Sequence, residues 1–418
     1  MIALAWILSG LSLLTSVLLL VRTKSPIGWF VLVPKLFAEA LAPVWALAGA
    51  AGAGLGWVTR AFWAIPIGVV GAGMMIAYVW QCSRDHKGFE NAFGAGWSDQ
   101  IPAEQAKRMV QKRWSGFLRM KASPEPYWER DLAFWKIPDT DRQLLCDLWR
   151  PANGQASGLA IIYFHGSGWH ILDKDFGTRP FFRHLVAQGH TVMDVAYRLC
   201  PEVNIYGMIG DVKRAMAWMK ANASRYGVDP DKIVLGGGSA GAHLALLAAY
   251  APQHPELTPA ELKNVDLDAC GVVSYYGPTD LLACYEYENQ QKTVDLPPVP
   301  IGDPDYIPNK GDAGRIDTLL GGHPRDVPHM YELGSPVTHV RPGCPPTLLI
   351  QGKHDFLVPV DATCALYTKL VESGVPAINV LYPWTDHAFD LLFPQVNPAA
   401  QSALYDVDRF LALLANKD

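Results

Sequence analysis

Long apolar stretches dominate the N-terminal part of the chain. Ile2–Val21 contains no charged residue, and its length is close to the roughly 20 residues that a helix needs to cross a bilayer core. Leu36–Val58 is interrupted near its start by Glu39 and is rich in Ala and Gly, which permit close helix packing. Ala61–Trp80 is the third stretch. The pattern predicts three membrane spans; the alternative is two, in which the second and third stretches form a hairpin that only enters the interface.

Charges around the first stretch predict the orientation of this membrane region. No basic segment precedes the stretch, and it is longer than the apolar part of a secretory signal peptide, so we interpret it as an anchor. Arg22, Lys24 and Lys35 follow it, and basic residues favour the cytoplasmic side. Three spans return the chain to that side at Arg84 and Lys87. The sequence therefore predicts an integral, multi-pass membrane protein with a cytoplasmic C-terminal domain; a different number of spans reverses this orientation.

Beyond the membrane region, strand-like apolar runs alternate with helical segments. Such alternation is typical of the α/β class, in which helices cover both faces of a mostly parallel sheet. The predicted strands are Leu132–Ile137, Gln143–Trp149, Leu159–Phe164, His190–Ala196, Ile233–Leu235, Cys270–Tyr276, Thr347–Gln351 and Ile378–Tyr382. The predicted helices are Arg179–Gln188, Asp211–Tyr226, Ala242–Tyr250, Ala362–Ser373 and Ala399–Ala415.

Two segments depart from this alternation. Pro102–Lys121 has the spacing of an amphipathic helix, which we expect to form part of a cap over the functional site or, alternatively, to lie on the membrane surface. Leu281–Pro346 is rich in Pro, Gly, Asp and Tyr, and a segment of this length predicts a packed lid. The predicted organisation is a membrane region (residues 1–82), a linker with a cap helix (83–130) and an α/β domain (131–418) with a lid at about 281–346.

Composition removes several classes of partner. The 418-residue chain has a formal net charge of −5 and no basic stripe, so no nucleic-acid partner is expected. Its seven cysteines form no CxxC pair and have no metal-ligand spacing. Their odd number does not fit a fully paired disulfide framework. We therefore expect reduced thiols, which favour a cytoplasmic domain, and no metal or organic cofactor.

A glycine-rich turn offers a candidate nucleophile. The apolar run Ile233–Leu235 leads into Gly237–Gly241, which matches G-x-S-x-G with Ser239 at its centre and a helical segment after it. The serine of such an elbow needs a sharp turn that projects its hydroxyl above the sheet. Glycines two positions before and after it remove Cβ atoms that would collide with the neighbouring strand and helix. Ser239 is therefore the predicted nucleophile.

A serine nucleophile needs a base and an acid that orients the base, and in this fold they follow the serine in the order acid, then histidine. Asp355 lies just beyond the Thr347–Gln351 strand, and His387 lies just beyond the Ile378–Tyr382 strand. Catalytic groups of open α/β sheets gather at the carboxyl ends of the strands. Asp355 and His387 are therefore the predicted acid and base.

Four other residues compete for these roles. Asp386 is adjacent to the predicted base and therefore badly placed to reach its ring, whereas Asp280 follows another strand. His354 and His243 are interpreted as surface or core residues.

The remaining requirement is a set of donors for the oxyanion of a tetrahedral intermediate. His165–Trp169 reads His-Gly-Ser-Gly-Trp and follows the Leu159–Phe164 strand, where an HGGG-type loop supplies backbone N–H groups. Gly166 and Ser167 are the candidate donors, and the N–H of Ala240 completes the predicted oxyanion hole.

Together with Tyr197–Glu202 and Asp211, these motifs resemble the α/β-hydrolase fold, and within it the hormone-sensitive-lipase-like branch of serine esterases and lipases. The resemblance covers about residues 131–415. It implies a serine carboxyl-ester hydrolase whose cap combines the N-terminal segment with the 281–346 insertion. Ser167 stands where the family motif has a second glycine, which we expect to narrow the oxyanion hole, and Cys200 stands where the family has alanine.

The sequence therefore predicts a membrane-anchored serine hydrolase that cleaves carboxylic esters of short-to-medium acyl chains or lipophilic esters. Its predicted partners are a small-molecule or lipid ester substrate and the membrane lipid bilayer; the oligomeric state stays open. An amidase or formamidase and an acyltransferase are alternatives that use the same triad. A non-catalytic scaffold is a more remote alternative, because it normally lacks a triad member.

Overall fold

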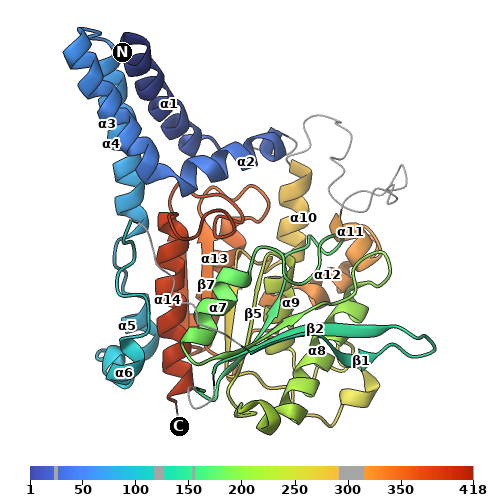
Figure 1. Cartoon of the computed structure of the whole chain (residues 1–418). Helices are drawn as coiled ribbons and strands as arrows, with labels where there is room; N and C mark the ends of the chain where they lie inside the picture. Colours follow the sequence, from blue (N-terminus) through green and yellow to red (C-terminus); the bar gives the residue numbers. More distant parts are fainter. Residues whose placement is uncertain (23–26, 117–126, 153–155, 291–314, 418) are drawn as a thin grey trace.

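A mostly parallel sheet forms the centre of the molecule in the computed structural model, which describes residues 1–22, 27–116, 127–152, 156–290 and 315–417 (Figure 1). Within these residues an eight-stranded sheet has the order β1-β2-β4-β3-β5-β6-β7-β8. The pairs β1–β2 and β2–β4 are antiparallel and all others are parallel, which confirms the predicted fold class. The strands are β1 (Tyr127–Lys136), β2 (Gln143–Arg150), β3 (Ala160–Phe164), β4 (Thr191–Val195), β5 (Ile233–Gly238), β6 (Gly271–Tyr275), β7 (Thr347–Gly352) and β8 (Ala377–Tyr382).

Alternate residues of the central strands point into two separate apolar layers. On β3, Ile162 and Phe164 pack in one layer, whereas Ile161 and Tyr163 pack in the other. The first layer is closed by α8 (Ile205–Asn222), α9 (Ala240–Tyr250) and α13 (Val360–Glu372), and the second by α7 (Arg179–Ala187) and α14 (Pro398–Ala415). Helices therefore cover both faces, as predicted, and these elements agree with the predicted ranges to within a few residues except at the starts of β1 and α8, which lie further upstream than predicted.

Three apolar helices project from the α/β domain (Figure 1): α1 (Ile2–Leu20), α3 (Ala42–Thr59) and α4 (Ala64–Cys82). A fourth, α2 (Ile27–Ala40), runs across the end of the α/β domain and meets α3 at a bend of 74°. Among the described residues, two helices are long and apolar enough to cross a membrane, or three if the bent pair is one span. The second predicted stretch is therefore not one helix, because residues 36–40 belong to α2.

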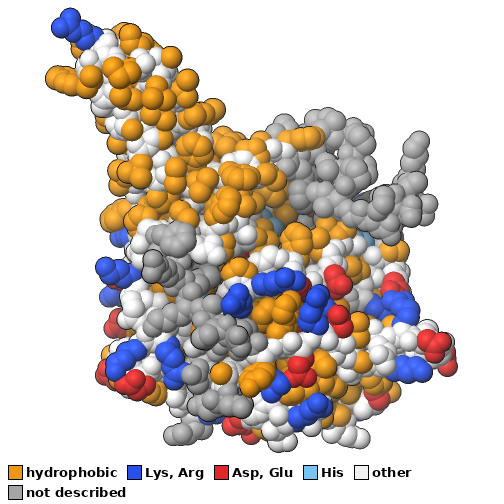
Figure 2. Space-filling view, viewed as in Figure 1, with side chains coloured by type: hydrophobic (Ala, Val, Ile, Leu, Met, Phe, Trp, Pro, Cys, Tyr) orange, Lys and Arg blue, Asp and Glu red, His pale blue; other side chains and the backbone are white. Residues whose placement is uncertain are grey.

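Small residues bring the projecting helices together. A Cβ built on Gly49 would lie 2.5 Å from the Ser12 hydroxyl, and one built on Gly71 would lie 2.6 Å from the backbone nitrogen of Leu13. Ser9, Ser12 and Ser16 of α1 are fully buried between the helices. Large apolar side chains point outward and give the projection its hydrophobic surface (Figure 2).

The predicted amphipathic helix at 102–121 is not formed. Only α6 (Ala103–Ala106) is helical there, after α5 (Gly88–Phe93) and the 3-10 turn η1 (Trp97–Gln100), and residues 117–121 lie outside the described residues. Polar groups of α14 bind the segment instead: the Asp408 carboxylate accepts the Val110 N–H at 2.7 Å, and Gln401 accepts the Ser115 N–H at 3.0 Å. These tertiary hydrogen bonds replace helical ones, and they hold the segment against α14.

The described parts of the predicted lid contain short helical segments joined by turns. They comprise α10 (Leu281–Gln290), α11 (Arg315–Leu320), α12 (Pro328–Gly334) and the 3-10 turn η4 (Pro336–His339); residues 291–314 lie outside the described part. Tyr285 and Tyr331 pack edge to face with ring centroids 5.7 Å apart. From α10, the Tyr287 hydroxyl donates to the Asp355 carbonyl at 3.1 Å, so the insertion contacts the loop of the predicted acid.

Candidate active site

Ser239 occupies a strained turn between β5 and α9. Its backbone has φ 51° and ψ −122°, in the left-handed half of conformational space that residues with a side chain rarely adopt. The flanking glycines make room for this turn. A Cβ on Gly237 would lie 2.6 Å from the Phe164 carbonyl oxygen, and one on Gly241 would collide with the same oxygen. Because a side chain at either position would collide with the neighbouring backbone, this elbow requires glycine at both 237 and 241.

The three residues predicted to form a triad are in contact. His387 Nε2 lies 3.0 Å from Ser239 Oγ, and His387 Nδ1 lies 2.9 Å from Asp355 Oδ2. A carboxylate only accepts hydrogen bonds, so Nδ1 carries the proton and Nε2 accepts the hydroxyl proton of Ser239. The geometry is that of a nucleophile, a base and an orienting acid in series.

Backbone donors fix the carboxylate of Asp355. Its Oδ1 accepts the N–H groups of Leu357 and Val358, each at 2.9 Å, and its Oδ2 also accepts from the Gln351 side chain at 3.1 Å. Asp355 is buried. These bonds fix the orientation of the carboxylate, with Oδ2 directed to His387 Nδ1.

Burial and charge act in opposite directions on His387. Loss of hydration disfavours the imidazolium, but the carboxylates of Asp355, Asp386 and Asp390 outweigh this effect and raise the pKa of His387 above its ordinary value. The raised pKa increases the basicity of the imidazole, which is the property that a base for Ser239 needs.

The candidate oxyanion donors lie in the loop after β3 and at the start of α9. Gly166 lies against the elbow, since a Cβ built on it would be 3.5 Å from the Ser239 Cβ. Ala240 is the first residue of α9, so its N–H has no acceptor within the helix. The Ser167 hydroxyl lies 2.7 Å from the Tyr197 hydroxyl and accepts from the Trp169 N–H at 2.9 Å. Because that hydroxyl is directed into the supporting loop, the expectation that it narrows the oxyanion hole loses its basis.

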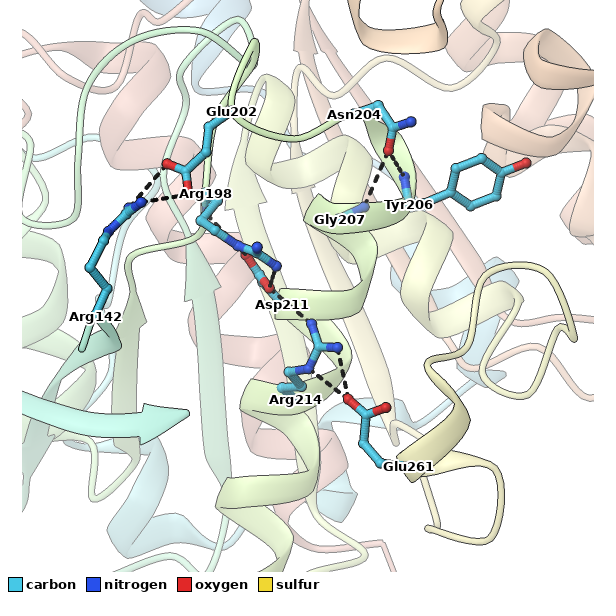
Figure 3. A network of polar contacts seen from close by, with 9 residues as sticks. All are labelled: Arg142, Arg198, Glu202, Asn204, Tyr206, Gly207, Asp211, Arg214 and Glu261. Atoms are coloured by element: carbon cyan, nitrogen blue, oxygen red, sulfur yellow. Dashed lines mark hydrogen bonds and ion pairs between the residues drawn. The ribbon is translucent and has the colours of Figure 1, made fainter. Parts of the chain in front are cut away.

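A polar network holds the loop after β4, which supports the oxyanion loop. The Tyr197 hydroxyl donates to the His165 carbonyl at 2.8 Å. The Arg198 guanidinium donates to both oxygens of the buried Asp211 carboxylate. Figure 3 shows Arg214 continuing this network from Asp211 to Glu261. The motif residues Tyr197, Arg198 and Asp211 therefore act on the site through the backbone that they support.

The competing residues have other partners. Asp280 caps α10 by accepting the Ala283 N–H at 3.0 Å. His243 is fully buried; its Nδ1 accepts from the Trp169 indole at 3.2 Å and its Nε2 donates to the Gly334 carbonyl at 2.7 Å. None of these contacts reaches the candidate triad.

Asp386 and His354 also stay outside the triad, because their side chains point to the N-terminal helices. The Asp386 carboxylate lies 3.0 Å from Lys35 Nζ, and His354 Nδ1 lies 3.1 Å from the Leu19 carbonyl oxygen.

Two residues near the base were not predicted from the sequence. The ring centroids of Tyr276 and His387 lie 4.4 Å apart, and the Tyr276 hydroxyl donates to the Asp390 carboxylate at 2.5 Å. Tyr276 follows β6 directly, so its position at the carboxyl end of a strand was the available signal. Within the described residues, no group of three or more His, Cys, Asp or Glu side chains is arranged to hold a metal ion.

Comparison with known proteins identifies the family of this site. A family model, BD-FAE, matches residues 146–370, which is more than half of the chain. The chain belongs to the BD-FAE family. The matched residues contain the elbow, the oxyanion loop and the loop of Asp355, whereas His387 lies beyond their end.

Two curated relatives of this BD-FAE chain come from Mycobacterium tuberculosis. "Probable carboxylic ester hydrolase LipM" is 32% identical over 270 residues, covering 64% of this chain and 57% of LipM. "Esterase LipQ" is 28% identical over 312 residues, covering 73% of this chain and 69% of LipQ. The chain thus spans little more than half the length of LipM. Esterase 2 of Thermogutta terrifontis with bound butyrate matches 70% of this chain and 94% of its own at 24% identity and a TM-score of 0.51, which shows the same α/β-hydrolase fold.

Proposed function

We propose that this BD-FAE chain is a membrane-anchored serine hydrolase that cleaves carboxylic esters. One observation carries the proposal: the hydrogen-bonded series from Asp355 through His387 to Ser239, which ends on a hydroxyl in a strained elbow. We assign Ser239 as nucleophile, His387 as general base and then general acid, and Asp355 as the group that orients the imidazole. The names of LipM and LipQ support ester hydrolysis as the reaction.

The proposed reaction begins when His387 removes the proton of the Ser239 hydroxyl and Oγ attacks the ester carbonyl carbon. The carbonyl oxygen becomes an oxyanion that accepts hydrogen bonds from the backbone N–H groups of Gly166, Ser167 and Ala240. Loss of one such donor typically raises the barrier by about 3 kcal/mol. The C–O bond then breaks, and the alcohol leaves with the proton held on His387. Asp355 stabilises the imidazolium during both steps.

The acyl-enzyme is resolved by water. His387 removes a proton from the water as it attacks the acyl carbon, and the second tetrahedral intermediate uses the same three donors. Its collapse releases the carboxylic acid and returns the proton to Ser239 Oγ. Apart from the ester and water, the proposed cycle uses only side chains and backbone of this chain.

Membrane anchoring through residues 1–82 is the second part of the proposal. Its support is the outward apolar surface of α1, α3 and α4, on which Leu14, Leu47 and Trp57 are 66%, 71% and 73% exposed. A helix of about 19 residues spans about 28 Å, close to the roughly 30 Å of a bilayer core. The junction with the α/β domain lies at the end of the helices where Arg22 follows α1, so the positive-inside tendency supports a cytoplasmic domain.

The domain plan and the substrate class complete the proposal. Residues 83–130 form a linker and 131–418 the catalytic domain, with 281–346 as its lid; α10 reaches the Asp355 loop through Tyr287, which supports a lid. The motif at 165–169 favours the hormone-sensitive-lipase-like branch. We assign esters of short-to-medium acyl chains or lipophilic esters as substrates, because lipophilic esters partition into the bilayer that holds the enzyme.

A labelling and turnover assay tests this proposal. The full-length protein in detergent should react with a fluorophosphonate probe and hydrolyse p-nitrophenyl acetate, and Ser239→Ala should remove both activities, with a fall in kcat of about 10⁶-fold, as found for subtilisin. Failure of wild-type protein to be labelled would favour the scaffold. Faster turnover of an aryl formamide would favour a formamidase, and ester formation with an added alcohol would favour an acyltransferase.

A further inference from the structure

The carboxylate of Asp386 joins the two loops that carry the acid and the base of the proposed triad. Its Oδ1 accepts the Phe356 N–H at 3.1 Å and the His387 N–H at 2.8 Å. Phe356 follows Asp355 directly, so one oxygen atom holds the backbones of both loops. The separation of Asp355 and His387 therefore depends on Asp386, although its side chain does not touch the imidazole that Asp355 orients.

Helix α2 supplies the charge that Asp386 needs in this buried place. Lys35 Nζ lies 3.0 Å from Asp386 Oδ2, and the two side chains are 0% and 1% exposed. Lys35 also donates to the Val21 carbonyl at 2.9 Å. Burial raises the pKa of Asp386 whereas Lys35 lowers it, so the charge on the carboxylate depends on Lys35. A buried carboxylate without its partner is strongly unfavourable.

A second side chain of α2 holds the backbone of the same residue. Glu39 Oε1 accepts the Asp386 N–H at 2.9 Å, and Glu39 is fully buried. Lys35 and Glu39 are four residues apart, which places them on one face of the helix. Charged residues are almost never fully buried unless they are paired. Lys35 pairs with the Asp386 carboxylate, and Glu39 accepts the Asp386 N–H, so both polar side chains of this apolar helix meet the same residue.

The neighbouring residues dock to the same helices. The Tyr78 hydroxyl of α4 lies 3.0 Å from the Thr385 hydroxyl, and His354 Nδ1 lies 3.1 Å from the Leu19 carbonyl oxygen of α1. A Cβ added to Gly28 would collide with the ring of Phe356, so α2 lies directly against the acid loop. These contacts of the N-terminal helices with the α/β domain therefore fall on residues close to Asp355 and His387 in the sequence.

We propose that Lys35 and Glu39 are positioning residues for the reaction: through Asp386 they hold the acid and base loops in register, so that catalysis requires the docked α2. This inference rests on the proposed function. It makes the membrane region part of the working active site. It assigns Lys35 a role beyond the orientation of the chain in the membrane, and it assigns a role to Glu39.

A double-mutant cycle on Lys35 and Asp386 tests the proposal. The full-length protein is assayed in detergent with a p-nitrophenyl ester, and kcat is expressed per site titrated with the fluorophosphonate. Lys35→Met should lower kcat about 10- to 100-fold, the effect of a displacement of about 1 Å, and leave KM within about threefold. Asp386→Asn should also lower kcat. The fold-loss in kcat of the double variant should be smaller than the product of the two single fold-losses. The amide that replaces the carboxylate still offers an oxygen to both loops, and it no longer needs a cation.

The Glu39 variants separate position from stability. Glu39→Leu should lower kcat about tenfold, since it leaves the Asp386 N–H without an acceptor, whereas Glu39→Gln retains an oxygen and should recover most of that loss. This pair carries the test if Lys35→Met does not fold. The matched control is Lys213→Met. Lys213 is a buried lysine of α8 that donates to the Ala251 carbonyl at 2.7 Å, remote from the triad, and its loss should lower the melting temperature without changing kcat per titrated site.

The outcomes separate this inference from the proposed function. An inactive wild-type protein would refute the hydrolase itself. An active wild-type protein whose Lys35→Met and Glu39→Leu variants keep the wild-type kcat per titrated site, with only a lower melting temperature, would overturn the positioning role. Additive losses in the cycle would equally overturn the coupling between Lys35 and Asp386.

Discussion

The projecting helices and the sheet domain are both apolar, yet their side chains are arranged in opposite ways. In α9 every residue is buried, and the large side chains of β5 fill the interior of the sheet domain. In α1 the buried positions are held mostly by Ala and Ser, while Leu14 is 66% exposed. Large residues thus lie inside one region and outside the other. The difference is the one expected if the proposed membrane anchor is correct, because water excludes apolar groups from one surface whereas lipid accepts them on the other.

After the loss of activity expected for Ser239→Ala, the largest expected effect lies at the polar edge of the sheet domain. Asp355→Asn keeps the size of the side chain but no longer fixes the imidazole tautomer, so kcat should fall about 10⁴-fold, as for the equivalent change in a serine protease. Ester hydrolysis at saturating substrate measures it. Activity near that of wild type would point to Asp280 as the acid.

Removing a large side chain from the sheet interior should be the next largest effect. Leu235 of β5 is fully buried, and Leu235→Ala should lower the free energy of unfolding by about 2–5 kcal/mol because a cavity remains. Denaturant unfolding in detergent, followed by a probe of the sheet domain, measures the change. A loss below about 1 kcal/mol, close to the transfer free energy of one methylene group, would contradict tight packing of this layer.

Adding a large side chain between the projecting helices should be harmful to a lesser degree. A Cβ on Gly68 would collide with the Gly49 backbone and lie 2.7 Å from the Ser9 hydroxyl, so Gly68→Leu should destabilise the helix bundle by about 1–3 kcal/mol. The melting temperature of the full-length protein in detergent reports it. Gly54→Leu is the matched control, since nothing lies within 4 Å of a Cβ built there.

The pH dependence should reveal the charges around the base. Activity needs neutral His387, and carboxylates raise its pKa, so the imidazolium persists to a higher pH than in an unperturbed histidine. The acid limb of kcat/KM should therefore have its midpoint above 6.5. Asp355→Asn should move that midpoint downward in its residual activity. A wild-type midpoint below 6.5 would mean that burial outweighs the carboxylates.

The smallest effect is expected on the outer face of the projecting helices. Leu47 is 71% exposed, and Leu47→Ala should change the free energy of unfolding in detergent by less than about 0.5 kcal/mol. The contrast with Leu235→Ala compares the same substitution in the two regions. Equal losses of unfolding free energy at Leu47 and Leu235 would contradict the difference between the two regions.

The sheet and the candidate triad could be predicted because their signals are local. Runs of apolar residues predict strands, and Ser239, Asp355 and His387 each lie directly after one, so the carboxyl ends of the strands bring them together. The G-x-S-x-G spacing places glycines two residues before and after Ser239, so the need for small residues at 237 and 241 could be read from the sequence. The candidate nucleophile, acid and base could thus be named from the sequence, and the structure brings the three side chains within hydrogen-bond distance.

Non-local contacts account for what the sequence did not predict. The 102–121 segment has a helical pattern, but hydrogen bonds from α14, remote in the chain, determine its path. Glu39 interrupted an apolar stretch without explanation because its partner, Asp386, is 347 residues away. Lys35 was interpreted as a charge that sets orientation in the membrane, and burial against Asp386 changes that interpretation. A periodic pattern predicts which face of a segment is apolar, but it does not predict which group from a distant part of the chain will contact that segment.

The pairing of Lys35 with Asp386 also has a consequence for biosynthesis. The two residues are 351 positions apart. At a translation rate of about 5–20 residues per second, the ribosome needs roughly 20–70 s to make the second after the first. During that interval the nascent α2 holds a cation and a carboxyl group with no Asp386 to meet them. The newborn chain must therefore keep its first helices competent for docking until its last quarter has emerged.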